Sequence, residues 1–314
     1  MRARAILPLS AAAAGAALVY ASVVERNWFA LRQVEVPVLA ADAQPLRILH
    51  ISDLHLTPGR KRLMDWVASL DSLDPDLVVN TGDSIAHPDS IRYLVRALGS
   101  LLDRPGVFVF GSNDLYRPTP KNPARYLWET SARRYPRHEP DLPWQKLGDT
   151  LADAGWLDAN NQSGRIKAGG LDIAVAGVHD PHIKRDRYER VAGTADPSAD
   201  LRLGIMHAPE PRILDRFTDD GYDLLFAGHT HGGQLCLPGY GALVTNCEVD
   251  RARVSGLHQH PAEGTPARDG RRAWLHVSAG LGTSPWAPAR FACRPEATLL
   301  TLVPARGERS ATEE

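Results

Sequence analysis

The chain contains few cysteines and no excess of either charge. Three of its 314 residues are cysteine, and Cys236, Cys247 and Cys293 lie far apart without a CxxC spacing. This excludes a thiolate zinc site, and the odd number argues against a disulfide framework, although one disulfide between Cys236 and either of the others stays open. The formal net charge is −1. A chain without a basic excess gives no reason to expect a nucleic-acid partner.

One long uncharged run stands at the N-terminus. Residues 6–24 carry no charge, two arginines precede them, and Trp28 follows. Nineteen such residues are just long enough to cross a bilayer, and a tryptophan suits the interface beyond it. We therefore predict that residues 1–27 form a membrane anchor, with the catalytic body outside the cytoplasm. Because 19–21 resemble a cleavage site, a cleaved signal peptide and a secreted form compete with this interpretation, as does a soluble buried helix.

The remaining chain has the composition of a globular protein, with 43% hydrophobic and 23% charged residues. Apolar runs that end in turn residues alternate with segments of helical spacing, which predicts an α/β sheet. Residues 28–45 are predicted to be a connector, 46–304 one domain and 305–314 a disordered tail. The expected strands are 46–51, 76–80, 107–110, 170–178, 201–206, 222–227, 239–244, 275–279 and 299–303, the last closing a second sheet; the expected helices are 60–73, 90–102, 144–154 and 211–217.

Two segments interrupt this pattern. Residues 115–143 contain six prolines and an excess of basic side chains. An insertion of this length is a functional lid whose cations could hold phosphate oxygens, or a solvated surface loop with a short helix near 124–133. Residues 251–272 are polar and are predicted to be a loop.

Polar side chains follow the predicted strands at their carboxyl ends, which is where α/β sheets place their sites. A glycine-rich loop, 228–234, directly follows the apolar run 222–227 and allows its two histidines a tight turn. Oxygen and nitrogen ligands without a thiolate favour two divalent cations over one structural zinc, and Asp83 is the natural carboxylate to bridge them. The candidate ligands are Asp53, His55, Asp83, Asn113, His207, His229 and His231.

These blocks resemble the calcineurin-like metallophosphoesterase family. The order is Asp53-Leu54-His55, Gly82-Asp83, Gly111-Ser112-Asn113-Asp114, His207 and Gly228-His229-Thr230-His231. The block Gly280-Leu281-Gly282-Thr283-Ser284, followed by Arg290 and Arg294-Pro295-Glu296, is similar to that of the membrane-associated bacterial subfamily. The resemblance covers roughly residues 25–304 and implies a four-layer αββα sandwich of two mixed sheets behind an N-terminal hydrophobic helix.

The resemblance also implies the chemistry. Metal one would be held by Asp53, His55, Asp83 and His231, and metal two by Asp83, Asn113, His207 and His229. Manganese, iron or zinc suits such mixed ligands, and two ions can activate a bridging water or hydroxide against a phosphorus centre. The implied reaction is hydrolysis of a phosphodiester or pyrophosphate. Its substrate would be phosphorylated and small or lipid-linked, such as a UDP-diacylglucosamine-like pyrophosphate of the cell envelope.

The third block departs from the family pattern, which has Gly-Asn-His. An ungapped comparison puts Ser112 at the ligand position, whereas a shift by one residue restores Asn113 as the ligand. We prefer the shift because a hydroxyl is the poorer ligand. The missing histidine leaves the proton donor for the leaving group open, and the candidates by residue type are Asp114, His179, His182 and His138.

Two other classes of function remain. A metal-binding regulatory protein could keep this fold with little turnover, which the missing histidine favours. A mononuclear hydrolase of non-phosphate esters would bind one ion per chain. The complete double set of ligands argues against both. Two further histidines, His50 and His276, have no sequence feature that connects them to the site.

Overall fold

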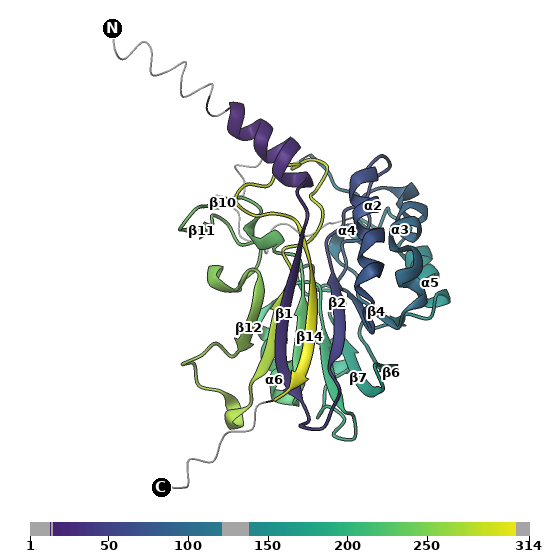
Figure 1. The fold of residues 1–314 in the computed structure, drawn as a ribbon, viewed down its shortest axis with the longest axis vertical. Coiled ribbons are helices and arrows are strands. Elements are labelled where there is room, and N and C mark those ends of the chain that lie inside the picture. The colour runs from purple at the N-terminus through teal and green to yellow at the C-terminus, as the bar shows by residue number, and fades with distance from the viewer. Residues whose placement is uncertain (1–12, 14, 121–137, 306–314) are drawn as a thin grey trace.

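Two six-stranded mixed sheets form the centre of the molecule in the computed structural model, which describes residues 13, 15–120 and 138–305 (Figure 1). The first sheet has the strand order β1-β14-β2-β3-β4-β5 and the second β12-β13-β9-β8-β7-β6. The strands are β1 (Ala30–Leu39), β2 (Leu46–Ile51), β3 (Leu77–Asn80), β4 (Gly106–Phe108), β5 (Leu157–Asp158), β6 (Gln162–Ala168), β7 (Leu171–Gly177), β8 (Leu201–Ile205), β9 (Leu224–Ala227), β12 (Gly256–His260), β13 (Ala273–Val277) and β14 (Glu296–Pro304).

Three apolar cores separate the layers. Side chains of alternating residues on β2 and β3, among them Ile48 and Val79, pack against Leu203 and Phe226 of the second sheet. The opposite face of the first sheet packs under α2 (Lys61–Ser69), α3 (Ile91–Leu98) and α5 (Trp144–Asp153). The second sheet is covered by α6 (Pro211–Asp220). Because β3 and β9 are buried along their whole length, they carry continuous apolar runs rather than alternating ones.

The carboxyl ends of the parallel strands in both sheets lie at the same end of the molecule, where the candidate site lies. Strands β2 to β5 are parallel, and so are β7, β8, β9 and β13. Strands β1 and β14 run antiparallel to β2, so they start at the edge where β2, β3 and β4 end. The N-terminal helical segment, which includes Tyr20–Val24 and Glu25–Asn27, therefore lies at the same end as the loops after these strands (Figure 1).

Three sequence predictions were wrong. Residues 28–45 do not form a connector, because Ala30–Leu39 is a ten-residue strand that pairs in parallel with β14. The predicted strand 299–303 is part of β14 and belongs to the first sheet, not the second. The polar segment 251–272 contains β12, an antiparallel partner of β13. In the first and third cases pairing with a buried neighbour outweighed local composition, whereas in the second the strand itself was expected and only its sheet was not.

The remaining segments differ in smaller ways. The predicted strand 239–244 is only a two-residue strand, β11 (Gly241–Ala242), paired with β10 (Cys236–Leu237). The predicted helix near 124–133, most of the tail 305–314 and the start of the predicted anchor lie outside the described residues. Within the described residues, no helix combines the length and the apolar character that crossing a bilayer requires.

Candidate metal centre

The seven predicted ligands meet at one end of the two sheets. The loops after β2, β3 and β4 supply four of them, and the loops after β8 and β9 supply three. Six are buried or nearly so, and Asn113 is the second residue of the short helix α4 (Ser112–Leu115). Their side chains form two groups that share Asp83.

The first group contains Asp53, His55 and His231. The two Nε2 atoms of His55 and His231 lie 3.2 Å apart, and His231 Nε2 lies 3.6 Å from Asp53 Oδ1. His55 Nε2 is 3.5 Å from Asp83 Oδ2. One donor atom each of Asp53, His55 and His231 could surround a single ion.

The second group contains His207, His229, Asn113 and the same carboxylate. His207 Nε2 is 3.6 Å from Asp83 Oδ2, and His229 Nδ1 is 3.2 Å from His207 Nε2. The side-chain amide of Asn113 is 2.6 Å from Asp83 Oδ2, whereas Ser112 contacts only that amide, at 3.4 Å. Asp83 Oδ2 thus faces both groups, as a bridging carboxylate would.

The donor atoms fit divalent cations. Asp53 Oδ1 is buried and has no hydrogen-bond partner among the described residues, although it faces two imidazoles. Buried polar atoms are otherwise almost always paired, so such an atom marks the position of a missing partner. Imidazole nitrogens and carboxylate or amide oxygens are ligands that manganese, iron and zinc accept. The residues present therefore match the metals that the sequence predicts.

Charge and burial fix the protonation of the second group. Burial alone would raise the pKa of Asp83, but His207 and His55 outweigh it and hold that pKa well below its ordinary range. Burial alone would lower the pKa of His207, but Asp83 and Asp180 outweigh it and raise that pKa well above its ordinary value. The His207 imidazole therefore carries a proton beside the Asp83 carboxylate. This positive charge lies where a bound cation would lie.

The other three histidines are neutral. Burial is the largest cause that lowers the pKa of His55, His229 and His231. Neighbouring imidazoles lower the pKa of His229 and His231 further, namely those of His182 and His55 respectively. Neutral imidazole is the form that binds a metal ion, so the site is ready for cations at neutral pH.

The backbone at the site is strained. Asp53, His55, Asp83, His229 and His231 all have φ between 42° and 68°, a region that costs most residues about 1–3 kcal/mol.

Two glycines make this close approach possible. A Cβ on Gly228 would lie 2.0 Å from Ser52 Oγ and 2.6 Å from Asp53 Oδ2. A Cβ on Gly111 would lie 2.2 Å from Asp83 Oδ1. Any side chain at these two positions would displace the ligands.

A buried chain of hydrogen bonds supports Asp53. His276 Nδ1 and His50 Nδ1 are 2.8 Å apart, and His50 Nε2 is 2.9 Å from Thr81 Oγ1. Thr81 donates to Ser52 Oγ at 2.7 Å, and Ser52 donates to Asp53 Oδ2 at 2.5 Å. With His50 as a donor through Nε2, all four bonds point toward the carboxylate. Sequence analysis missed this chain; the alternation of polar His50 and Ser52 on an otherwise apolar strand was the available signal.

Further contacts orient the histidines. His207 Nδ1 donates to Thr81 O at 2.7 Å, and His229 Nε2 lies 3.2 Å from Asn246 O. These bonds turn His207 Nε2 and His229 Nδ1 into the site, where a cation would displace the proton on His207 Nε2. Arg290, fully buried, donates to His231 O at 3.2 Å and to Gly282 O at 2.7 Å. The role of Asn246 could not be seen from its sequence context.

Asp114 lies behind the site. Its carboxylate accepts four backbone N–H groups, those of Asp83, Ser84, Ile85 and Gly111, at 2.7 to 3.2 Å. Burial, followed by the nearby Asp83 carboxylate, raises the pKa of Asp114 to about 7. Its hydrogen bonds are those of a group that holds the loop after β3 in place.

The three histidine candidates for proton donation lie at different depths. His179 is buried, and burial followed by the charge of Arg185 lowers its pKa to about 3. His182 is also buried, and its ring lies 4.3 Å from that of the predicted ligand His229. His138 is exposed and contacts the ring of Tyr116, 5.3 Å away. Of the three, His182 directly contacts a predicted metal ligand.

Comparison with known proteins agrees with this geometry. Residues 46–233 match the family described as calcineurin-like phosphoesterase. The chain belongs to the calcineurin-like phosphoesterase family. This confirms the family predicted from the sequence and makes the protein a metallophosphoesterase, a hydrolase that acts on phosphoester bonds.

Relatives of this phosphoesterase include proteins with named activities. It is 27% identical to the phosphodiesterase YaeI of Escherichia coli over 289 residues, which cover 90% of this chain and 92% of that one. It is 25% identical to the UDP-2,3-diacylglucosamine pyrophosphatase LpxG of Chlamydia trachomatis over 310 residues, 88% of each chain. A transmembrane protein with a metallophosphoesterase domain from Bos taurus is 28% identical over 212 residues, 66% of this chain and 45% of that one.

Proposed function

We propose that this phosphoesterase hydrolyses a phosphodiester or a pyrophosphate at a centre of two divalent cations. Asp53, His55 and His231 would hold one ion, while His207, His229 and Asn113 would hold the other, with Asp83 between them. The observation that supports this most directly is the position of Asp83 Oδ2, which lies about equally far from His55 and His207. When bound, two such ions supply positive charge for the phosphate oxygens and lower the pKa of a coordinated water.

The protein residues would hold this arrangement rigid. Ser52 and the backbone N–H of His229 fix Asp53 Oδ2, so that Oδ1 points into the site. Asp114 would position Asp83 through the backbone N–H groups of the loop rather than exchange protons itself. For protonation of the leaving group we assign His182, whose ring contacts that of His229, rather than His179, whose pKa of about 3 leaves it neutral at neutral pH.

The relatives and the N-terminal sequence support a substrate class. Two relatives are named as a phosphodiesterase and as a pyrophosphatase of a diacylated nucleotide sugar, which supports a lipid-linked or envelope-located phosphate. The uncharged run 6–24 would anchor the chain in a membrane, with the domain outside the cytoplasm. A water-soluble phosphorylated metabolite is the alternative substrate.

The test uses the full chain in detergent, stripped with a chelator and reloaded with manganese. Bound metal is counted by elemental analysis, and turnover is measured on bis-p-nitrophenyl phosphate and p-nitrophenyl phosphate. We expect two ions per chain and metal-dependent hydrolysis, both lost in Asp83→Asn. The same substitution at the exposed Asp103 is the matched control and should change neither.

The two other functions give different results. One ion per chain that survives Asp83→Asn, with turnover of carboxylic esters, would favour a mononuclear hydrolase. Two ions with no hydrolysis of either ester or of a UDP-linked lipid pyrophosphate would contradict the proposal and favour a metal-binding regulatory protein.

A further inference from the structure

Large apolar side chains on the surface are concentrated in three segments. Twelve such residues are at least a third exposed among the described residues, and Val95 on α3 is the single one outside these segments. The segments are residues 18–28, residues 235–243 and Trp286, which we call the apolar end. Its exposed members are Leu18, Val19, Tyr20, Val23, Val24, Trp28, Leu235, Leu237, Tyr240, Leu243 and Trp286.

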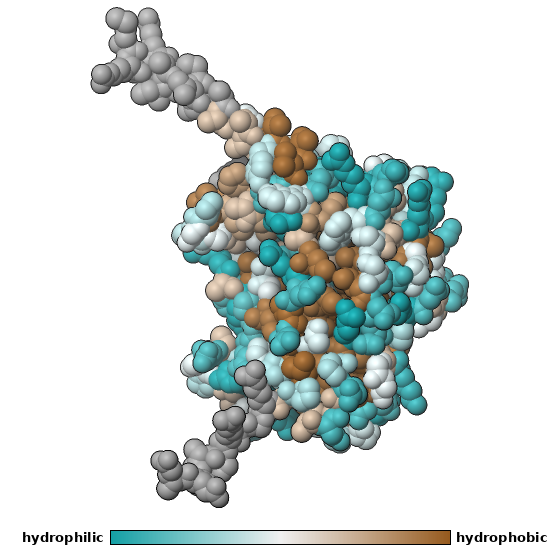
Figure 2. Space-filling view, viewed as in Figure 1, coloured by the Kyte–Doolittle hydropathy of each residue, from teal (hydrophilic) through white to brown (hydrophobic). Residues whose placement is uncertain are grey.

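The three segments lie together at the metal-site end of the domain. The ring of Tyr20 packs edge-on against Phe291, and Phe291 O accepts the backbone N–H of Cys236 in β10. Trp286 belongs to the same loop as Phe291. Figure 1 shows the N-terminal helix and the β10–β11 hairpin at one end of the sheets, and Figure 2 shows apolar side chains gathered where that helix meets the domain.

This end carries almost no free charge. Residues 232–247 and 273–289 contain no charged side chain, in a protein with 23% charged residues. Several charged groups that flank these stretches are paired: Glu25 accepts the backbone N–H groups of Ala292 and Cys293, Arg26 donates to Thr283, and Arg294 donates to two backbone carbonyls. A loop that faced only water would have no need to lack charge.

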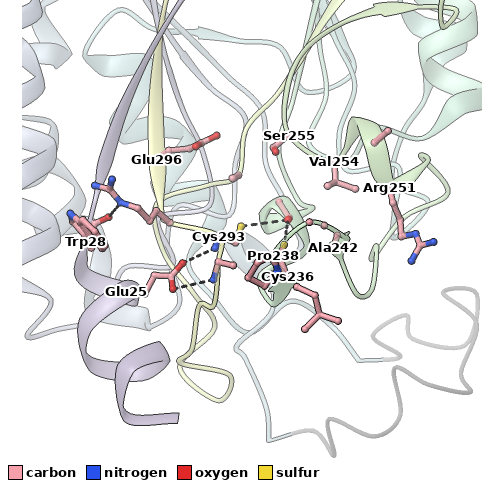
Figure 3. Close-up of a pocket in the computed structure, with 18 of the residues that line it drawn as sticks. Glu25, Trp28, Cys236, Pro238, Ala242, Arg251, Val254, Ser255, Cys293 and Glu296 are labelled. Carbon is pink, nitrogen blue, oxygen red and sulfur yellow. Dashed lines mark hydrogen bonds between the residues drawn. The ribbon is translucent and has the colours of Figure 1, made fainter. Parts of the chain in front are cut away.

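A cavity of about 560 Å³ separates the two main segments of the apolar end. Glu25 and Trp28 line it on the N-terminal side, while Pro238 and Ala242 line it on the hairpin side (Figure 3). Arg32, Arg251, Arg294 and Glu296 also line it, so the cavity combines charged side chains with apolar ones between two apolar flanks.

We infer that the folded domain docks on a lipid bilayer through the apolar end, with the metal site turned toward the membrane surface. Two observations favour lipid over a protein partner. The exposed residues 18–24 belong to the uncharged run 6–24, so the surface continues a segment of membrane character. Arg294 stacks on Trp28, and Arg251 stacks on Tyr240, at 4.2 and 4.7 Å. Aromatic and cationic side chains side by side suit the headgroup layer, where rings are anchored and anionic lipids attract arginine.

Docking in this orientation brings the site and the membrane together. His231, a predicted ligand, is four residues before Leu235, and Cys293 Sγ contacts His231 O at 3.2 Å. Docking of the domain on the bilayer needs neither bound metal nor turnover. Only its consequence, that a lipid-linked phosphate reaches the site from the bilayer surface, rests on the proposed function.

The experiment measures which tryptophan reaches the lipid. Full-length protein is reconstituted into phosphatidylcholine and phosphatidylglycerol vesicles, with or without acyl chains brominated to quench tryptophan fluorescence. The contribution of Trp286 is the difference in fluorescence between the wild type and Trp286→Phe. We expect brominated vesicles to quench this contribution. The emission lost on Trp274→Phe is the control and should not be quenched, because Trp274 contacts Pro37 O near the C-terminal end of β1, at the opposite end of the domain.

Hydrogen exchange provides a second readout that needs no substitution. We expect slower exchange in residues 235–243 on vesicles than in detergent, and no change in α3. An unquenched Trp286 with unchanged exchange in 235–243, while residues 18–24 alone are protected, would overturn the inference. Protection of 235–243 in detergent that grows with protein concentration would overturn it in favour of a second copy of the chain. Activity is read separately, so a failure of docking and a failure of the proposed chemistry are distinguishable.

Discussion

The hydroxyl of Ser52 is the most informative single group to remove. It is buried and lies between Thr81, which donates to it at 2.7 Å, and Asp53 Oδ2, to which it donates at 2.5 Å. The substitution Ser52→Ala removes the donor of a bond to a charged group, worth about 1.5–3 kcal/mol, and leaves the Thr81 hydroxyl without its acceptor. Asp53 Oδ2 keeps the backbone N–H of His229 at 3.0 Å, so the carboxylate stays in place but is held less firmly.

The expected magnitude follows from this balance. A loss of about 1.5–3 kcal/mol corresponds to roughly a 10-fold to 150-fold weaker metal affinity, which agrees with the about 10–100-fold typical of residues that orient metal ligands. Manganese affinity is measured by calorimetric titration of the stripped protein. Turnover at saturating manganese should fall less than affinity, because the ligands themselves are unchanged.

The control is Ser69→Ala. That hydroxyl donates to the exposed carbonyl of Trp66 at 2.6 Å and has no connection to the site. It should leave manganese affinity unchanged. If Ser52→Ala binds manganese as tightly as the wild type, the buried chain from His276 to Asp53 does not support the metal ligand and the reasoning fails.

Three further substitutions test other parts of the site. Asp114→Ala leaves four backbone N–H groups without an acceptor, so we expect the free energy of unfolding to fall by at least about 3 kcal/mol; lost turnover with unchanged thermal stability would instead indicate a proton donor. Gly228→Ala forces a methyl group within 2.0 Å of Ser52 Oγ and should abolish metal binding, whereas Gly148→Ala on α5, with 3.1 Å to its nearest neighbour, should not. His182→Gln should lower kcat for alkyl phosphodiesters at least about 10-fold more than for p-nitrophenyl esters, because general acid catalysis is worth about 100-fold or more for a poor leaving group; equal losses on both would exclude His182 as the acid.

Local patterns predicted the parts of the fold whose residues are buried on one face. The apolar runs of β2, β3, β8 and β9 were expected within one or two residues of their true ends. The four main helices start within one residue of the expected positions, but α2, α3 and α6 end three or four residues away from the expected ends. The errors fell on β1 and β12, whose sequences are largely polar or interrupted by proline. Both are the first or last strand of their sheet, and an edge strand pairs on one side only, so it needs little apolar character.

The gathering of the seven candidate ligands was predictable for a different reason. Each candidate lies within five residues after a buried strand, and parallel strands bring their carboxyl ends to one edge, so order in the sequence becomes proximity in space. The supporting residues gave no such signal. Asn246 reaches His229 from a loop, and His276 reaches His50 from the other sheet. Only the packing of the two sheets brings these residues together.

The strained backbone and the facing donor atoms have one common explanation. Five of the predicted ligands adopt left-handed φ values, and two buried carboxylates approach four imidazoles, with one donor oxygen unpaired among the described residues. Each of these features destabilises the folded chain on its own, and they occur together only where the surrounding structure enforces them. Cations bound by the folded state and not by the unfolded chain would offset this cost, because binding adds to the free energy of unfolding. The rest of the domain must therefore be stable enough to hold the site open, which explains why the ligands stand at the ends of its most deeply buried strands.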